Sequence, residues 1–295
     1  MRPAVTGPSV VDGMPPGDYH ASPGLSASGA KLLLDPGCPA LYKWAADHGR
    51  PPKREFDLGH AAHTQVLGIG EPLEIVDADN WRTKDAKERR AKAYEAGLVP
   101  ILAAEWAVVQ GMAAALRRHP IAGPLLEPGT GRAELSLFWH DAEFDIPRRA
   151  RLDWVKGRLI GDYKSCVSAH PAACAKAMVS FGYGAQGEWY RAGGQACDLV
   201  GDDAAFLLVF QERTPPYLVT VAEPDPAALA AGRDRNRAAM DRYARCTASG
   251  VWPGYAVAGG TTDDAIVPLS LPRWAEYEHD TALARGDYDT EADTP

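Results

Sequence analysis

The chain has few cysteines, lacks long apolar runs and carries no excess of positive charge. Its 295 residues contain five cysteines, none of them in a Cys-x-x-Cys pair. A zinc ribbon, an iron–sulfur cluster and a disulfide framework are therefore not indicated. The sequence also contains no run of about 18 apolar residues and no apolar segment typical of a secretory signal. We expect a cytoplasmic protein with reduced thiols that does not enter a membrane.

The formal net charge of −8 argues at first against a nucleic-acid partner. Most of the excess negative charge lies near the end of the chain, however, where the sequence from Glu276 onward contains seven acidic residues and one basic residue, Arg285. The charge of the tail therefore says little about the body of the protein. The hydrophobic content of 46% can supply a full core.

Composition divides the chain into three parts. Residues 1–17 are rich in proline and glycine and are expected to form a flexible arm, whereas the acidic residues 259–295 are expected to be a disordered tail. Residues 18–258 are expected to form one domain. Its first part, 18–120, is mainly helical, with helices predicted at about 38–48, 55–68, 84–96 and 101–118.

The texture changes at about residue 130, where a sheet-containing core extends to residue 258. Three short segments with strand character, "ELSLFWHD", "RRARLDWV" and "GRLIGDYK", are separated by turn residues. A helix at about 170–192, the apolar strands "AAFLLVFQE" and "PYLVTVAE", and a helix at about 225–248 follow. This order predicts an α/β or α+β fold built on one mixed sheet.

The two middle strands carry two acids and a lysine whose positions can be tested geometrically. A two-residue turn at Lys156-Gly157 would pair Asp153 with Ile160. Asp153, Asp162 and Lys164 would then share one face, with the two acids as diagonal neighbours roughly 7–8 Å apart at Cα. A three-residue loop would place the acids on opposite faces, and ordinary strand-end acids are the simpler alternative.

Together these three side chains suit the hydrolysis of a phosphodiester. Two carboxylates at that separation can converge on one divalent cation. Such a cation polarises a phosphoryl oxygen and lowers the pKa of a bound water. Lys164 would orient that water or stabilise the developing charge.

At these residues the sequence resembles the PD-(D/E)XK nuclease superfamily, with Asp153 as the first acid and "DYK" (162–164) as the (D/E)xK element. It resembles more closely the phage and prophage RecE-like exonucleases, also called exonuclease VIII. The supporting stretches are "YHASPGLSASGAKLLLDPGCPALY", "LGHAAHTQVLG", "ELSLFWHD", "RRARLDWV", "LIGDYKS", "FGYGAQGEWY", "TPPYLVTV" and "GVWPGY". The resemblance implies a restriction-endonuclease-like core with a helical N-terminal region.

The resemblance also implies roles for individual residues. His63 in "GHAAH" matches a helical histidine that approaches the metal, and Glu134 in "ELS" matches an acid that completes the metal shell. Gln186 and Tyr190 match a Gln-x-x-x-Tyr pair on the helix that flanks the active site. His60 does not match the motif. Taken alone, His63 would more often be a hydrogen-bonded core or surface histidine, Glu134 could simply be a solvated strand residue, and Gln186 and Tyr190 could serve in helix packing.

The activity implied is Mg²⁺-dependent digestion of linear double-stranded DNA in the 5′ to 3′ direction, with Mn²⁺ able to substitute. It would leave 3′ single strands for a RecT-like single-strand annealing protein in phage recombination, and relatives form homo-oligomeric rings around DNA. Two alternatives stay open. The chain could be another PD-(D/E)XK nuclease, endonucleolytic or structure-specific, or a DNA-binding module that no longer cuts.

Two features depart from the resemblance. Tyr163 and Ser165 stand where relatives often have an apolar residue and threonine, and positive charge is sparse for an enzyme that follows DNA. The candidate phosphate contacts are the pair Arg148-Arg149 and a basic segment. That segment comprises Arg82, Lys84, Lys87, Arg89, Arg90 and Lys92, and it could equally be a solvated helix in which Asp85 and Glu88 are the partners.

Overall fold

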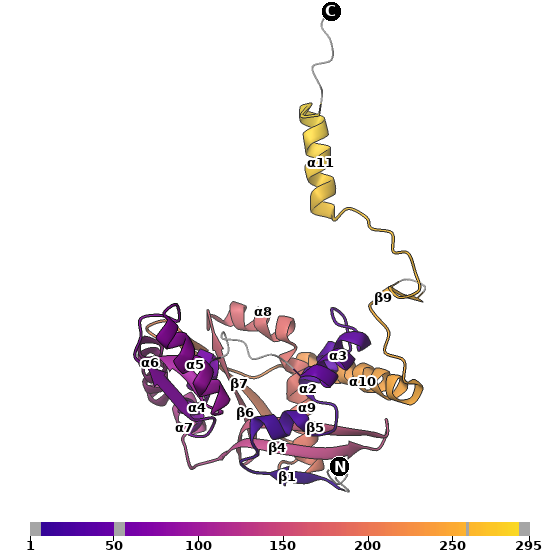
Figure 1. Ribbon diagram of the computed structural model, residues 1–295. Coiled ribbons are helices and arrows are strands. Elements are labelled where there is room, and N and C mark those ends of the chain that lie inside the picture. Colours follow the sequence, from indigo (N-terminus) through magenta and orange to yellow (C-terminus); the bar gives the residue numbers. More distant parts are fainter. Residues whose placement is uncertain (1–6, 50–56, 258–259, 289–295) are drawn as a thin grey trace, which may run out of the picture. The chain divides into compact units, whose positions relative to one another are not determined.

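The computed structural model describes residues 7–49, 57–257 and 260–288, in two compact units that we consider separately, Met1–Trp252 and Pro253–Pro295 (Figure 1). The helices of the first unit are α1 (Pro16–Ala21), α2 (Ala27–Leu32), α3 (Pro39–His48), α4 (Asp57–Leu67), α5 (Lys84–Glu95), α6 (Ala103–Arg118), α7 (Ala122–Leu125), α8 (Pro171–Phe181), α9 (Tyr183–Ala196) and α10 (Pro226–Ser249). Its strands are β1 (Ser9–Val11), β2 (Leu73–Val76), β3 (Val99–Leu102), β4 (Arg132–Asp141), β5 (Ile146–Lys156), β6 (Leu159–Cys166), β7 (Ala205–Glu212) and β8 (Val219–Ala222).

The expected mixed sheet is confirmed. Six strands lie in the order β1-β4-β5-β6-β7-β8, and β6 and β7 are parallel whereas the other neighbours are antiparallel. Tight turns join β4, β5 and β6, as antiparallel neighbours allow, while the parallel step from β6 to β7 crosses over through α8 and α9.

Helices cover both faces of this sheet. Leu208 and Phe210 on β7 pack into a core that includes Trp189 of α9, whereas Val209 between them packs into a second core with Met112 of α6. Strand side chains alternate between faces, so an almost wholly apolar strand such as β7 must be buried on both sides. Helix α10 packs in turn against α9. The result is a sheet between two helical layers.

The turn between β5 and β6 differs from the prediction. Lys156 pairs with Leu159, so the turn residues are Gly157 and Arg158 rather than Lys156 and Gly157. Gly157 has a φ of 56°, which an L-residue rarely adopts and which glycine tolerates at the first central position of a hairpin turn. The true pairing is displaced by two residues from the predicted one, and the side chains keep their faces.

The helix expected over residues 170–192 is two helices. Gly182 adopts the left-handed conformation, with φ 71° and ψ 37°, and terminates α8. Such a glycine is a common helix C-terminal signal. The chain changes direction there, and α9 begins at Tyr183 as a separate helix.

The N-terminal part is helical as expected, but it also contains a small parallel sheet that the sequence did not indicate. Strand β2 pairs with β3, and Ile75 lies opposite Ile101. The helix expected from residue 101 therefore begins at Ala103 as α6. Pro100 favours this boundary because proline cannot donate a backbone hydrogen bond within a helix.

The expected arm and tail contain regular structure in the residues that are described. Within the arm, β1 pairs with the edge of β4, with Val10 opposite Leu137, and covers a strand edge that would otherwise be open. Within the second unit, β9 (Ala256–Val257) pairs with β10 (Gly260–Thr261), and α11 (Arg273–Arg285) is a helix rather than the expected disordered segment. In the described ranges, no helix has both the length and the apolar character needed to cross a membrane.

Candidate active site

A break in the sheet brings the first two acids together. Along β4 and β5, Ala133 pairs with Trp154 and Leu135 pairs with Leu152, but Glu134 and Asp153, which lie opposite each other in this register, form no ladder pair. Glu134 has a left-handed φ of 54°, a conformation that is uncommon for a residue with a side chain and costs about 1–3 kcal/mol. The faces switch at this point, because Leu135 packs into one core and Ala133 against the other.

The third acid lies across the next strand. The β5–β6 ladder ends where Trp154 pairs with Gly161, and the same register puts Asp162 opposite Asp153. Instead of a ladder bond, the Tyr163 backbone N–H donates to Asp153 Oδ2 at 2.9 Å. Asp153 and Asp162 are thus direct neighbours across diverging strands, not the diagonal neighbours that the predicted turn implied.

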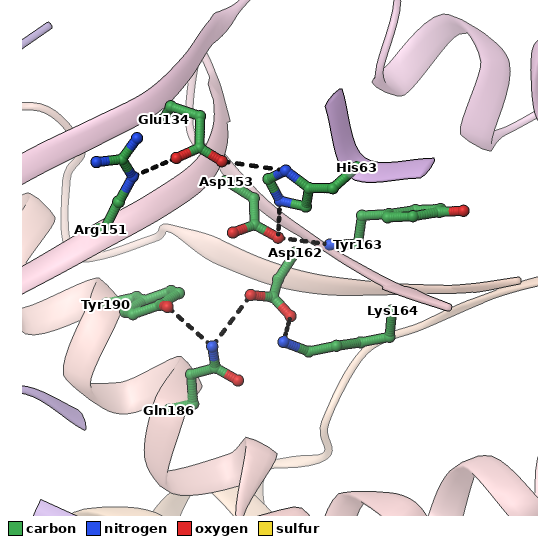
Figure 2. A network of polar contacts seen from close by, with 9 residues as sticks. All are labelled: His63, Glu134, Arg151, Asp153, Asp162, Tyr163, Lys164, Gln186 and Tyr190. Carbon is green, nitrogen blue, oxygen red and sulfur yellow. Dashed lines mark hydrogen bonds and ion pairs between the residues drawn. The ribbon is translucent and has the colours of Figure 1, made fainter. Parts of the chain in front are cut away.

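His63 approaches these carboxylates from α4. Its Nδ1 lies 3.1 Å from Glu134 Oε1 and its Nε2 lies 3.1 Å from Asp153 Oδ2 (Figure 2). The three side chains are largely buried, with exposed fractions of 22%, 12% and 17% for His63, Glu134 and Asp153. Of the predicted site residues, His63 is the one contributed by the helical N-terminal region, and it closes the group from the face opposite α9.

A second set of contacts surrounds Asp162, whose side chain is 1% exposed. Its Oδ2 lies 2.6 Å from Lys164 Nζ, and its Oδ1 accepts a hydrogen bond from Gln186 Nε2 at 3.1 Å. The same Gln186 nitrogen lies 2.8 Å from the Tyr190 hydroxyl (Figure 2). Because Gln186 and Tyr190 are four residues apart on α9, they share a helix face, as the sequence predicted.

Burial and charge act against each other at these groups. Burial disfavours a charge on His63, but the carboxylates of Asp153, Glu134 and Asp162 raise its pKa above the ordinary value. Burial raises the pKa of Asp162 to about 7, with the Asp153 charge adding to the effect and Lys164 opposing it. The pKa of Lys164 is raised, because the attraction of Asp162 and Asp153 exceeds the penalty of burial. Lys164 is therefore a cation at neutral pH.

The donor set fits a divalent cation. One ligand atom from each of His63, Glu134 and Asp153 lies within 4.8 Å of the other two. Two ligands of one ion, each at about 2.0–2.6 Å, can be no more than about 4–5 Å apart. Asp162 is next to this group because it lies opposite Asp153 in the β5–β6 register. Carboxylate oxygens and an imidazole nitrogen are suitable ligands for Mg²⁺, Mn²⁺ or Zn²⁺.

Two contributors were not anticipated from the sequence. Arg151 donates through Nε to Glu134 and through Nη1 to the Met14 carbonyl at 2.8 Å. Its position two residues before Asp153 was a usable signal, because alternate strand residues share a face where the strand is regular. Tyr183 places its ring 4.9 Å from Lys164 Nζ, and its position could not be foreseen because it depends on the break between α8 and α9.

The site opens into a large cleft. A cavity of about 1910 Å³ is lined by His63, Glu134, Asp153 and Lys164 together with Gln186 and Tyr190. It also extends along α2, the C-terminal end of α8 and the N-terminal half of α10. Its volume is larger than the roughly 300–1,000 Å³ that is usual for small-molecule sites, so the cleft has room for a polymer segment.

The two basic clusters have different surroundings. Arg148 is 6% exposed, lies between the Trp139 and Trp189 rings and pairs with Asp141 at 2.9 Å. Arg149 donates to the backbone carbonyls of Tyr19, His20 and Ser22. This pair therefore serves the fold and is not available to DNA.

The basic segment lies mainly on α5, whose surface is exposed. Arg89 pairs with Glu74 at 2.6 Å, and Lys84 lies 3.8 Å from Glu88. Exposed ion pairs of this kind contribute little to stability. The α5 cluster thus remains the candidate for phosphate contacts.

Comparisons with known proteins identify the family and the fold of the chain. Residues 43–261 match the family described as "PDDEXK-like domain of unknown function (DUF3799)". A search of the curated proteins returned no match. Among solved structures, the chain is similar to a protein from Eubacterium rectale described as a "putative exonuclease", at 11% sequence identity and a TM-score of 0.57, with 85% of this chain and 92% of that chain covered.

The likeness to the solved structure concerns the fold, which is a mixed sheet with a restriction-endonuclease-like core. The family match covers most of the chain and includes all of the carboxylates and the lysine described above. The chain belongs to the PDDEXK-like domain family and, with it, to the PD-(D/E)XK superfamily.

Proposed function

We propose that this protein is a Mg²⁺-dependent exodeoxyribonuclease that degrades linear double-stranded DNA from 5′ to 3′ and leaves 3′ single strands. The observation that carries the proposal is the meeting of His63, Glu134, Asp153 and Lys164 in one large cleft, with the buried Asp162 in contact with Lys164. Membership of a nuclease superfamily supports hydrolysis. The polarity and the preference for ends follow from the RecE-like resemblance of the sequence.

His63, Glu134 and Asp153 would hold the divalent cation, with Asp162 beside them. When bound, such an ion polarises a phosphoryl oxygen and lowers the pKa of a water molecule. Arg151 holds the Glu134 carboxylate toward the group. Imidazole nitrogens and carboxylates bind metal ions in their deprotonated forms, so His63 must be neutral in the loaded site.

Lys164 acts as a charge and a hydrogen-bond donor. Its pKa is raised by Asp162 and Asp153 against the effect of burial, so it is protonated at neutral pH and does not serve as a general base. An ammonium group at this position can donate to the attacking water or to a phosphoryl oxygen as negative charge develops. Gln186 fixes one oxygen of Asp162 and leaves the other facing Lys164.

Digestion of a plasmid in its linear and covalently closed forms tests the proposal. The linear form should disappear in Mg²⁺ and persist in EDTA, while closed circles should persist in both. Labels on the 5′ and 3′ ends of a linear duplex, with and without a 5′ phosphate, then report the polarity. Early release of 5′-labelled mononucleotides is the expected result, and early release of the 3′ label would contradict the polarity.

Two other outcomes separate the alternatives. Nicking or linearisation of the closed circle would indicate an endonuclease of the same superfamily. Absence of hydrolysis of any DNA in Mg²⁺ or Mn²⁺, together with retained binding, would indicate a DNA-binding module. Intact Asp153, Asp162 and Lys164 favour the enzyme.

The partners proposed are double-stranded DNA ends and a RecT-like single-strand annealing protein, with the chain itself forming a homo-oligomeric ring. These proposals rest on the sequence resemblance. Light scattering coupled to size-exclusion chromatography tests the ring, since a monomeric mass over the working concentration range would contradict it. Co-elution with a purified annealing protein tests the partner.

A further inference from the structure

Beside the acids and Lys164, an aromatic pair continues the site toward the surface. The Phe181 and Tyr183 rings are stacked, with centroids 5.6 Å apart and an interplanar angle of 24°. They lie on either side of Gly182, whose left-handed conformation separates α8 from α9. The Tyr183 ring also lies 4.9 Å from Lys164 Nζ, and both rings line the cleft that contains the acids.

The two rings differ in how much of them is buried. Tyr183 packs partly into the core, with its ring 6.0 Å from that of Phe210. Phe181, the last residue of α8, is 59% exposed although its side chain is large and apolar. A single exposed phenylalanine is unremarkable on a protein surface. Phe181 is different because it is stacked on a ring that touches Lys164.

Positive charge accompanies the exposed ring. Lys31 Nζ lies 5.5 Å from the Phe181 ring centroid and donates to the Ser180 carbonyl at 3.1 Å. Burial lowers the pKa of Lys31, and the nearby charge of Arg235 lowers it further. Within the described part of the chain, neither cation has an ion-pair partner. Lys31 and Arg235 line the same cleft as Phe181, and their positive charges favour an anion there.

We propose that Phe181, stacked on Tyr183, receives an unpaired base of the DNA strand in the cleft, and that Lys31 and Arg235 face the phosphates of that strand. This inference rests on the proposed function and names the substrate form at the same site. Aromatic side chains interleaved with cations are the usual platform for single strands, because every base has a stacking face. In a duplex both faces of an internal base are already covered, so an internal base must leave the duplex before it can stack on the ring.

Base removal at one position of an oligonucleotide tests the inference without hydrolysis. The probe is a set of 12-nucleotide single strands in EDTA, each with one abasic position, and binding is measured by fluorescence anisotropy. For the parent protein, one abasic position should weaken binding by about 5- to 150-fold, as loss of one stacked base does. Phe181→Ala should weaken binding of the intact strand by a similar factor and should show no further loss at that abasic position.

Two further variants complete the design. Phe181→Trp should restore both the affinity and the sensitivity to base removal. Val179→Ala, on the same helix and 78% exposed, should bind like the parent. The inference is overturned if Phe181→Ala binds as tightly as the parent, if base removal affects both proteins equally, or if no strand binds. An equal loss of affinity in Val179→Ala would also overturn the inference. It would indicate that this end of α8 is a general apolar surface for binding another protein.

Because metal is absent from this experiment, its outcome is independent of cleavage. Base-dependent coupling at Phe181 without any digestion in Mg²⁺ would retain the stacking site and refute the proposed nuclease. Digestion in Mg²⁺ without that coupling would support the proposed nuclease and refute the stacking site.

Discussion

Helix α9 carries Gln186 and Tyr190, and its position depends on a close contact with α10. A Cβ atom added at Gly232 of α10 would lie 2.5 Å from the carbonyl carbon of Gly184 and 2.6 Å from the nitrogen of Ala185. Both are backbone atoms that cannot rotate away, so the helices must separate. Asn236 Nδ2 donates to the Ala185 carbonyl at 2.8 Å across the same contact, and separation would stretch this bond as well.

Gly232→Ala is therefore expected to destabilise the first unit. Overpacking costs about 1–3 kcal/mol, and weakening the Asn236 bond adds about 1 kcal/mol. The better helix propensity of alanine offsets about 1 kcal/mol. The net loss of about 1–3 kcal/mol corresponds to a fall in Tm of about 2–4 °C per kcal/mol for a domain of this size.

Thermal unfolding of the full chain, followed by circular dichroism, measures this change. Gly17→Ala in α1 is the matched control, because a Cβ there has no atom within 4 Å, and its Tm should equal or slightly exceed that of the parent. Gly232→Ala should also cut DNA more slowly below its Tm, because Gln186 donates to Asp162 from the displaced helix. If Gly232→Ala is as stable as Gly17→Ala, the reasoning about this contact is wrong.

Three further predictions concern Asp162, Lys164 and His63. Asp162→Ala and Lys164→Ala should each reduce cutting by at least about 10²–10³ with an unchanged circular dichroism spectrum; activity within about tenfold of the parent would contradict their roles. Mn²⁺ at about 100 times its Kd should stabilise the parent by about 2.7 kcal/mol, and an equal rise in Tm for His63→Ala would remove His63 from the ligand set. The pKa of His63 is raised by the carboxylates despite burial, and burial raises that of Asp162 to about 7. Protons therefore compete with the metal below neutral pH, so calorimetric Mn²⁺ affinity should fall from about pH 8 to pH 6, and a constant affinity would refute this.

The strands of the sheet were predictable because their patterns are strong. Strand β7 is apolar on both faces and is buried on both, and the helix expected over 225–248 is present as α10. Breaks in regular structure were harder to foresee. Gly182 divides one expected helix in two because it adopts the left-handed conformation at the end of α8.

The meeting of Asp153, Asp162 and Lys164 was predictable even though the turn between their strands was placed wrongly. Moving the turn to Gly157-Arg158 displaces the pairing by two residues. Strand side chains alternate with a period of two, so such a shift keeps every side chain on its face. The prediction therefore placed the three side chains on one face with the wrong register, and a shift of one residue would have placed the two acids on opposite faces.

Glu134 shows what a strand pattern does not contain. Nothing in "ELSLFWHD" indicates a left-handed glutamate, because L-residues other than asparagine, aspartate and histidine seldom adopt that conformation. Its place in the candidate metal site was predicted from the family resemblance alone. In the fold, that conformation breaks the ladder opposite Asp153 and turns Glu134 toward His63.

The charges of the site explain why a proton and a metal ion are alternatives there. When Asp162 is ionised, three carboxylates face the two permanent cations Arg151 and Lys164, and a proton on His63 neutralises the remaining negative charge. A divalent cation in place of that proton would leave one net positive charge. A phosphodiester carries one negative charge, so the loaded site would match its substrate, whereas the protonated site is already neutral. His63, in contact with both Glu134 and Asp153, thus links pH to metal binding together with Asp162, whose pKa is raised to about 7 by burial.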